Sequence, residues 1–119
     1  MVDERITDGK RLAQLLASEL TGLETGPLAD VAVVDADPGV TPTPDGAEAY
    51  AIDHRGRHVG RVCVSPDEVE VRLDVAPRGI DPSALSVPAE ERADGVVLSV
   101  ESGAAVKRAV DAIRTLLAA

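Results

Sequence analysis

Apolar and charged residues alternate without a break along residues 68–75, Glu-Val-Glu-Val-Arg-Leu-Asp-Val. A β-strand sends successive side chains to opposite faces, so this segment has one apolar face and one charged face. A strand covered on both sides would not place four charged residues on one of them. The pattern therefore predicts a half-buried strand of an antiparallel sheet, with one dry face and one face in water.

Three further segments have the pattern of strands. Residues 47–65 are typical of a hairpin with its bend at residues 55–57, because Gly56 can adopt positive φ. This hairpin and the alternating strand after it predict a meander of three strands. Residues 28–36 are too apolar to show which face is wet, so we expect this strand inside the sheet. Residues 96–100 alternate as the last strand.

Two amphipathic segments predict helices at the ends of the chain. Within residues 1–24, five leucines recur at spacings of three and four, with Thr7 or Asp8 as the N-cap. A second helix is predicted from about Ala104 to Leu117, after a cap at Ser102. Both apolar stripes need a surface to cover, and the sheet offers one apolar face. We expect an α+β two-layer sandwich of about five largely antiparallel strands with both helices on one face, in the order αβββββα.

The segments between these elements look like connections. Residues 37–45 contain three prolines and predict a loop. Residues 76–88 form a longer connection with at most one short helix, capped by Asp81, and we expect Ile80 and Leu85 to pack against the sheet. With 119 residues and one predicted core, residues 1–119 are expected to form a single domain.

The composition narrows the class of protein. The chain has a net charge of −9, two lysines among twelve basic residues, no Phe or Trp, and Tyr50 as its one aromatic residue. Its many β-branched residues argue against disorder. A folded protein in concentrated salt explains the acidity better, because molar salt shortens the Debye length to about 3 Å and screens the repulsion between carboxylates.

The single cysteine and the lack of long apolar stretches indicate the cellular compartment. The single Cys63 lies in an apolar run and is typical of a buried thiol in a reducing, intracellular compartment. The N-terminus lacks the apolar run of a signal peptide, and no stretch of eighteen apolar residues could span a membrane. We therefore expect a cytoplasmic protein that has no membrane partner.

Candidate chemistry is concentrated in residues 53–58, Asp-His-Arg-Gly-Arg-His, with Cys63 five positions further on. Two imidazoles and a carboxylate could bind zinc or transfer a proton. However, a hairpin bend does not hold His54 and His58 on one face, and the sequence has no other histidine. No Ser, Thr or Cys is spaced for nucleophilic catalysis, and no glycine-rich motif predicts a nucleotide site. We expect no catalytic residue, no metal and no cofactor.

Basic side chains on the same hairpin give a case for phosphate binding. Arg55, Arg57, His58 and Arg61 are the candidate nucleic-acid or anion contacts, because arginine clusters recognise phosphate. The overall acidity and the lack of stacking aromatic residues argue against this role.

Residues 4–20, ERITDGKRLAQLLASEL, and residues 101–109, ESGAAVKRA, resemble a family of short acidic proteins of haloarchaea. The resemblance implies a halophilic cytoplasm. It implies no activity and no site residues.

These patterns favour a non-enzymatic module that binds another protein or forms a homodimer, with an acidic surface that serves solubility. The alternative is a DNA-associated regulator that uses Arg55, Arg57 and Arg61 of the hairpin. A small-ligand-binding domain or an enzyme is the third hypothesis.

Overall fold

The computed structural model describes residues 9–22, 30–37, 39–74, 85, 87–92 and 95–118. Two helices, α1 (Gly9–Gly22) and α2 (Gly103–Ala118), stand at the two ends of the element order. Between them lie the strands β1 (Val31–Val34), β2 (Ala47–His54), β3 (Arg57–Val64), β4 (Val69–Leu73), β5 (Ala89–Arg92) and β6 (Gly95–Val100).

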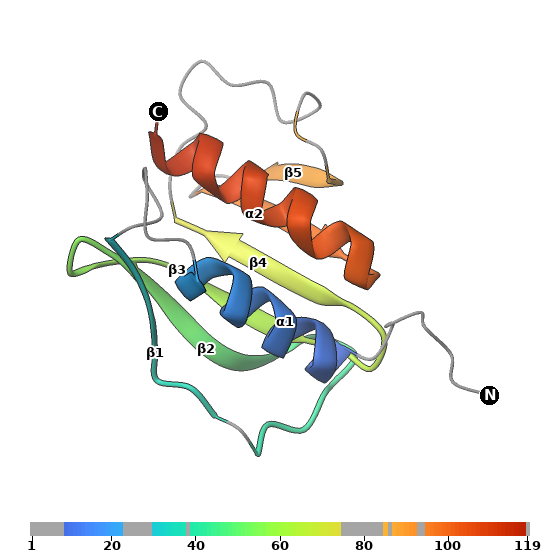
Figure 1. The fold of residues 1–119 in the computed structure, drawn as a ribbon. Coiled ribbons are helices and arrows are strands. Elements are labelled where there is room, and N and C mark those ends of the chain that lie inside the picture. Colours follow the sequence, from blue (N-terminus) through green and yellow to red (C-terminus); the bar gives the residue numbers. More distant parts are fainter. Residues whose placement is uncertain are drawn as a thin grey trace.

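The six strands form one antiparallel sheet in the spatial order β1-β2-β3-β4-β6-β5. Both helices lie side by side on the same face of this sheet (Figure 1). The α+β class, the two layers and the helix at each end are therefore as predicted. The predicted meander is confirmed as β2, β3 and β4, which are neighbours in the sheet and along the chain.

The strands differ from the prediction in two details. The sheet has a further strand, β5, at one edge. Its sequence Ala-Glu-Glu-Arg lacks the apolar alternation of a half-buried strand, because three of its four residues are exposed. The predicted strand 28–36 is shorter, Val31–Val34, and β1 forms the opposite edge instead of lying inside the sheet. Its apolar run is not caused by burial on both faces, since Ala32 is exposed.

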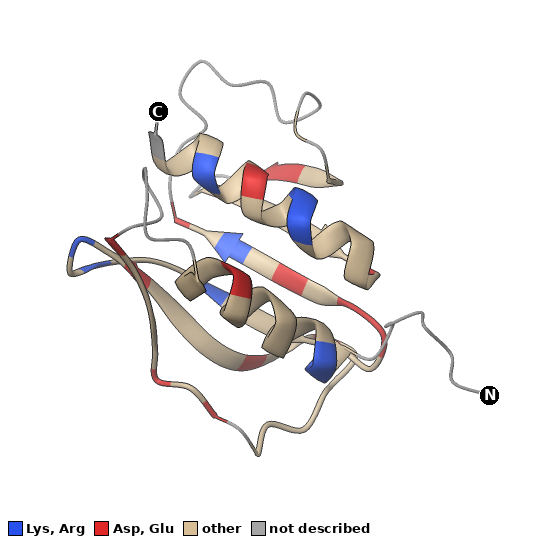
Figure 2. Ribbon diagram, viewed as in Figure 1, with Lys and Arg blue, Asp and Glu red and all other residues tan. Residues whose placement is uncertain are grey.

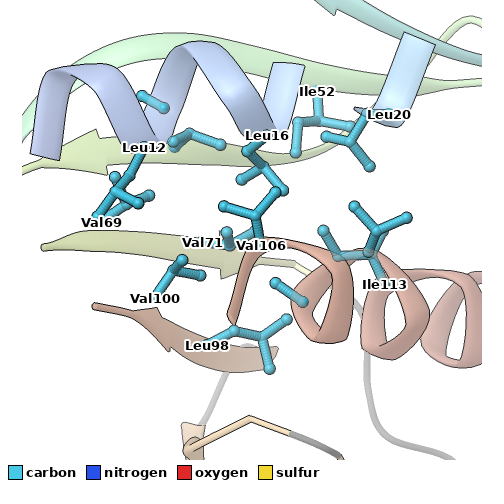
Figure 3. Close-up of a cluster of buried hydrophobic side chains, with 14 of the residues drawn as sticks. Leu12, Leu16, Leu20, Ile52, Val69, Val71, Leu98, Val100, Val106 and Ile113 are labelled. Atoms are coloured by element: carbon cyan, nitrogen blue, oxygen red, sulfur yellow. The ribbon is translucent and has the colours of Figure 1, made fainter. Parts of the chain in front are cut away.

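Within the alternating segment of residues 68–75, β4 supplies the middle of the core. Val69, Val71 and Leu73 of β4 are buried towards the helices, while Glu70 and Arg72 on the other face are half-buried. Leucines of α1 and aliphatic residues of α2 pack over Val69 and Val71 (Figure 3). The buried residues of both helices are Leu12, Ala13, Leu16, Leu20, Val106, Ala109, Val110, Ala112, Ile113 and Leu116.

Local signals explain where the helices begin. The N–H of Ala105 donates a hydrogen bond to the Ser102 hydroxyl oxygen at 3.2 Å. Ser102 is therefore the N-cap of α2, as predicted. The N–H of Gly9, the first residue of α1, donates to the carbonyl of Pro66 at 3.2 Å. Leu85 packs against the core as expected. The predicted caps Thr7 and Asp8, and Ile80 and Asp81 of the long connection, lie outside the described residues.

The helix-free face of the sheet is charged but not fully solvated. Cys63 points to this face and is nevertheless only 2% exposed. A loop covers it, because a Cβ added to Gly46 would lie 3.1 Å from the Cβ of Cys63. Arg72 ties the same loop down through a hydrogen bond of 3.1 Å from its Nη2 to the carbonyl of Asp45. No helix in the described part of the chain is long and apolar enough to cross a membrane.

Candidate functional site

The hairpin between β2 and β3 has a tight turn at its tip. Arg55 and Gly56 both have positive φ, 55° and 77°. This is the backbone of a two-residue type I′ turn, whose twist matches that of the flanking strands. Arg57 therefore begins β3 instead of completing the bend.

Acidic neighbours accompany three of the four basic residues that the sequence singled out. Arg55 Nε lies 3.3 Å from a carboxylate oxygen of Asp30, and Arg61 Nη1 lies 3.8 Å from Glu48. His58 Nε2 lies 3.4 Å from Asp74. A phosphate at the hairpin would have to compete with these carboxylates for each of those side chains.

The structure also separates Arg61 from the tip. Arg57 and Arg61 are four positions apart on β3, which is about 13 Å along a strand. Arg61 lies opposite Ala51 and Arg72 in the sheet, on the helix-free face. The four candidates thus divide into a group at the tip, formed by Arg55, Arg57 and His58, and Arg61 by itself.

Arg61 instead belongs to a hollow of about 440 Å³ on the helix-free face, with Arg72 and Arg92. Three guanidinium groups could suggest an anion site. Each has a glutamate partner, however: Arg61 has Glu48, Arg72 has Glu70 at 2.9 Å, and Arg92 has Glu90 at 3.2 Å. Asp74 also lines the hollow. Two carboxylates line the hollow beside the three guanidinium groups, and each guanidinium group already has a carboxylate partner, so the hollow does not favour an anion.

The histidines and Cys63 were the candidates for metal binding or proton transfer. Among the described residues, no group of three or more His, Cys, Asp or Glu side chains is arranged to hold a metal ion. Burial raises the pKa of the Cys63 thiol, and the nearby Arg72 and Arg61 only partly offset this. A buried thiol with a raised pKa is a poor nucleophile.

The outer edge of β1 offers main-chain groups for binding. The N–H of Arg55 donates to the carbonyl of Asp30 at 3.0 Å, and Val31 lies opposite His54 in the register. Hydrogen-bonded pairs alternate in an antiparallel ladder, so Ala32 also bonds inward to β2. Val31 and Val33 consequently turn their N–H and C=O groups outward. In the described part of the chain, β1 pairs only with β2.

The two sheet edges differ in charge. β1 consists of Val-Ala-Val-Val, whereas β5 carries Glu90, Glu91 and Arg92. Charged residues on an edge strand discourage pairing with another chain, and an apolar edge does not. Acidic segments stand at both ends of β1 (Figure 2). They are Asp30 before the strand and Asp35 and Asp37 after it.

A largely apolar pocket of about 240 Å³ lies beside β1, on the side of the sheet that the helices cover. Val33 forms its β1 wall, and Tyr50 lines it from β2. A cavity of about 150 Å³ is enough to hold benzene, so this pocket can take one large aliphatic or aromatic side chain. The remaining lining residues are Lys10, Ala13, Gln14, Ala17, Ala36, Asp37, Val40 and Ala49.

A protein-family model described as a family of unknown function (DUF7993) matches residues 1–119. The chain belongs to the DUF7993 family. Comparisons of this DUF7993 chain with curated proteins and with solved structures found no match. Family membership therefore agrees with the expectation of a family without a known activity, and it assigns no role to any residue.

Neither the pocket nor the open β1 edge of this DUF7993 protein was predictable from the sequence. Alanines line much of the pocket, and an alanine in an apolar helix stripe or strand looks like any other core position. One signal was present: β1 has no charged residue, while acidic residues stand directly outside it. That pattern fits an exposed edge strand as well as a buried one, and only the topology decides between them.

Proposed function

We propose that this DUF7993 protein is a non-enzymatic protein-interaction module that binds an extended polypeptide segment along the outer edge of β1. The observation that carries the proposal is the outward-facing backbone of Val31 and Val33 on an uncharged edge strand. Such an edge is a template for strand addition, in which main-chain hydrogen bonds provide affinity and neighbouring pockets provide specificity. Another protein or a second copy of the chain could supply the strand.

The free-energy contributions to peptide binding indicate that the pocket beside β1 also contacts the bound segment. Val31 and Val33 together offer two N–H and two C=O groups, and a hydrogen bond contributes about 0.5–1.5 kcal/mol net. Association costs at least about 4 kcal/mol in lost freedom of motion. Four main-chain bonds therefore barely offset the cost, whereas burying one large aliphatic side chain adds about 1.5–3 kcal/mol. Binding needs the edge and the pocket together.

The experiment is a selection of peptides from a displayed random library on the immobilised full chain, followed by affinity measurements on two proline variants. Val33→Pro removes an outward N–H and leaves the ladder to β2 intact. Glu91→Pro is the matched control, because Ser99 N–H donates to the Pro88 carbonyl at 3.0 Å and Glu91 therefore also faces outward, on the β5 edge.

We expect selected peptides to bind the unmodified chain and Glu91→Pro equally, and to bind Val33→Pro at least about tenfold more weakly. Circular dichroism checks that each variant folds, and Val31→Pro serves as the second edge variant if Val33→Pro does not. Sedimentation adds a second readout, since a dimer that Val33→Pro dissociates would also support the proposal. The proposal would be overturned if neither proline variant changed the affinity of the selected peptides, or if the selection yielded no binder.

A DNA-associated role of the hairpin is the second candidate. It is supported by the exposed Arg57 at the start of β3. Changing Arg55, Arg57 and Arg61 to Ala should then abolish retention of the protein on a DNA column at low salt. Unchanged retention would end this hypothesis, and it would leave the β1 proposal untouched.

A further inference from the structure

We infer that the segment bound at β1 belongs to a different protein, places one large aliphatic side chain in the pocket, and carries basic residues beside it. This inference rests on the proposed function, because it names the partner of the same edge. It follows from the direction of side chains across the new strand pair and from the charges that surround β1.

The direction of side chains places one partner residue at the pocket. Residues directly opposite each other in a strand pair point their side chains to the same face. Val33 lies opposite the core residue Ile52 of β2, so its side chain is on the helix-covered face. A partner residue bonded to the outward groups of Val33 therefore projects towards that same face, where the pocket lies.

The chemistry of the pocket selects an aliphatic residue. Alanine and valine side chains dominate the walls, with Tyr50 behind them. The Tyr50 hydroxyl is not available to a ligand as a donor, because it donates to the carbonyl of Ala13 at 2.8 Å. A partner side chain in this space gains contact with apolar atoms and few polar ones, which favours Leu, Ile, Met or Val.

Charge selects the residues beside it. Asp30 already pairs with Arg55, but Asp35 and Asp37 stand at the other end of β1. Asp37 and Lys10 both line the pocket, so the two aspartates leave this end with a net negative charge. The whole chain carries a charge of −9. A second copy would bring another −9 to the interface, and antiparallel pairing of two β1 strands would set Asp35 of one copy near Asp30 of the other. A basic segment meets attraction where a second copy meets repulsion.

The experiment uses three fluorescent probe peptides with one shared core of alternating Thr and Leu or Val. Lys residues flank the core in the first, Glu residues in the second and Ser residues in the third. Anisotropy titrations with the full chain give the affinities at about 0.1 M and 1 M KCl. We expect the basic probe to bind at least about tenfold more tightly than the acidic one at low salt. The preference should largely vanish at high salt, where the Debye length is about 3 Å.

Two sets of variants assign the effect to residues. Ala36→Leu adds bulk to an exposed wall of the pocket and should weaken all three probes at least about tenfold. Ala32→Leu is the matched control, because Ala32 is also exposed but lies in β1 on the helix-free face and does not line the pocket, and it should leave the affinities unchanged. Asp35→Asn combined with Asp37→Asn should remove most of the preference for the basic probe. At position 35, Asn tolerates the positive φ of 53°. At position 37, the amide oxygen of Asn keeps an acceptor for the Gly39 N–H.

The outcomes separate this inference from the proposed function. If the Ser-flanked probe loses binding on Val33→Pro while the basic probe has no advantage at low salt, the β1 edge binds strands but the basic partner is wrong. A dimer in sedimentation that Val33→Pro dissociates also contradicts the inference and supports the edge. Affinities that Ala36→Leu leaves unchanged would exclude the pocket as the aliphatic site.

Discussion

Tyr50, the single aromatic residue, connects the two layers of the fold. Tyr50 is 5% exposed, and its hydroxyl on β2 donates a hydrogen bond to the main-chain carbonyl of Ala13 in α1. A buried phenol in a valine and leucine core would be costly without that acceptor. Burial also raises the pKa of Tyr50 well above its ordinary value, because the phenolate would lose its hydration.

The raised pKa predicts a loss of stability at alkaline pH. An unfolded tyrosine releases its proton near pH 10, while the folded one keeps it to higher pH, so the unfolded state is favoured above pH 10. The free energy of unfolding should fall by up to about 1.4 kcal/mol per pH unit from this group. Tyr50→Phe should cost about 1 kcal/mol at pH 7 through the lost hydrogen bond, yet lack this contribution.

Urea unfolding at pH 7, 10 and 11 measures both effects. The stability advantage of the unmodified protein over Tyr50→Phe should shrink as the pH rises through 10, because only the unmodified protein contains Tyr50. Other alkaline groups titrate in both proteins, so their effects cancel in this comparison. An advantage that stays constant with pH would mean that Tyr50 ionises equally easily in the folded and unfolded states.

At the scale of elements, periodicity was reliable where one face is dry and one is wet. β4, β6 and α2 alternate or repeat clearly, because each buries one face against the other layer. β5 was missed because an edge strand with exposed residues has no apolar pattern. β1 was misplaced because its pattern is the same at an edge and inside a sheet. The hairpin tip was predictable from Gly56, whereas the pocket depends on contacts between α1, β1 and the loop after it.

One glycine fixes how α1 joins the sheet. Gly9 is buried, and a Cβ added there would meet the carbonyl oxygens of Ser65 and Glu68. Gly9→Ala should therefore push the first turn of α1 off the β3–β4 connection and cost about 1–3 kcal/mol. Gly22→Ala at the other end of α1 is the matched control, because nothing lies within 4 Å of its added Cβ.

Thermal and urea unfolding of the two variants tests this difference. Gly22→Ala should be neutral or more stable by up to about 1 kcal/mol, since alanine is the better helix former. Equal stabilities of the two alanine variants would show that the start of α1 can move away from the connection without loss.

At the scale of the whole molecule, charge is distributed unevenly between paired and unpaired carboxylates. Glu48, Glu70 and Glu90 each lie beside an arginine on the helix-free face. Around the start of β4, acids face acids: the pKa of Glu68 is raised, first by partial burial and then by the nearby Glu101, Glu70 and Asp67. Salt screens this repulsion between carboxylates and so stabilises the folded state. Exposed ion pairs contribute only about 0–1 kcal/mol each to stability, so salt can remove little by screening them.

The protein is therefore expected to become more stable as KCl rises from about 0.1 M to 2 M, with most of the gain below about 1 M, where screening is nearly complete. Asp67→Asn combined with Glu101→Gln changes the net charge from −9 to −7 and removes two acids that face Glu68. This variant should be more stable than the unmodified chain at 0.1 M KCl and gain less from salt. Asp111→Asn combined with Glu90→Gln reaches the same net charge by removing carboxylates that pair with Arg114 and Arg92, and should give no such gain.

Melting temperatures of the three proteins across the salt series separate local repulsion from net charge. If the two double variants respond alike, the net charge alone sets the salt response. A melting temperature that continues to climb in proportion to KCl above 1 M would instead indicate exclusion of salt from the protein surface, which strengthens apolar burial and does not saturate at these concentrations. A melting temperature that falls with KCl would mean that the Glu–Arg pairs of the helix-free face outweigh the repulsion, so that the acidic surface is an electrostatically stabilised one and not one that depends on salt.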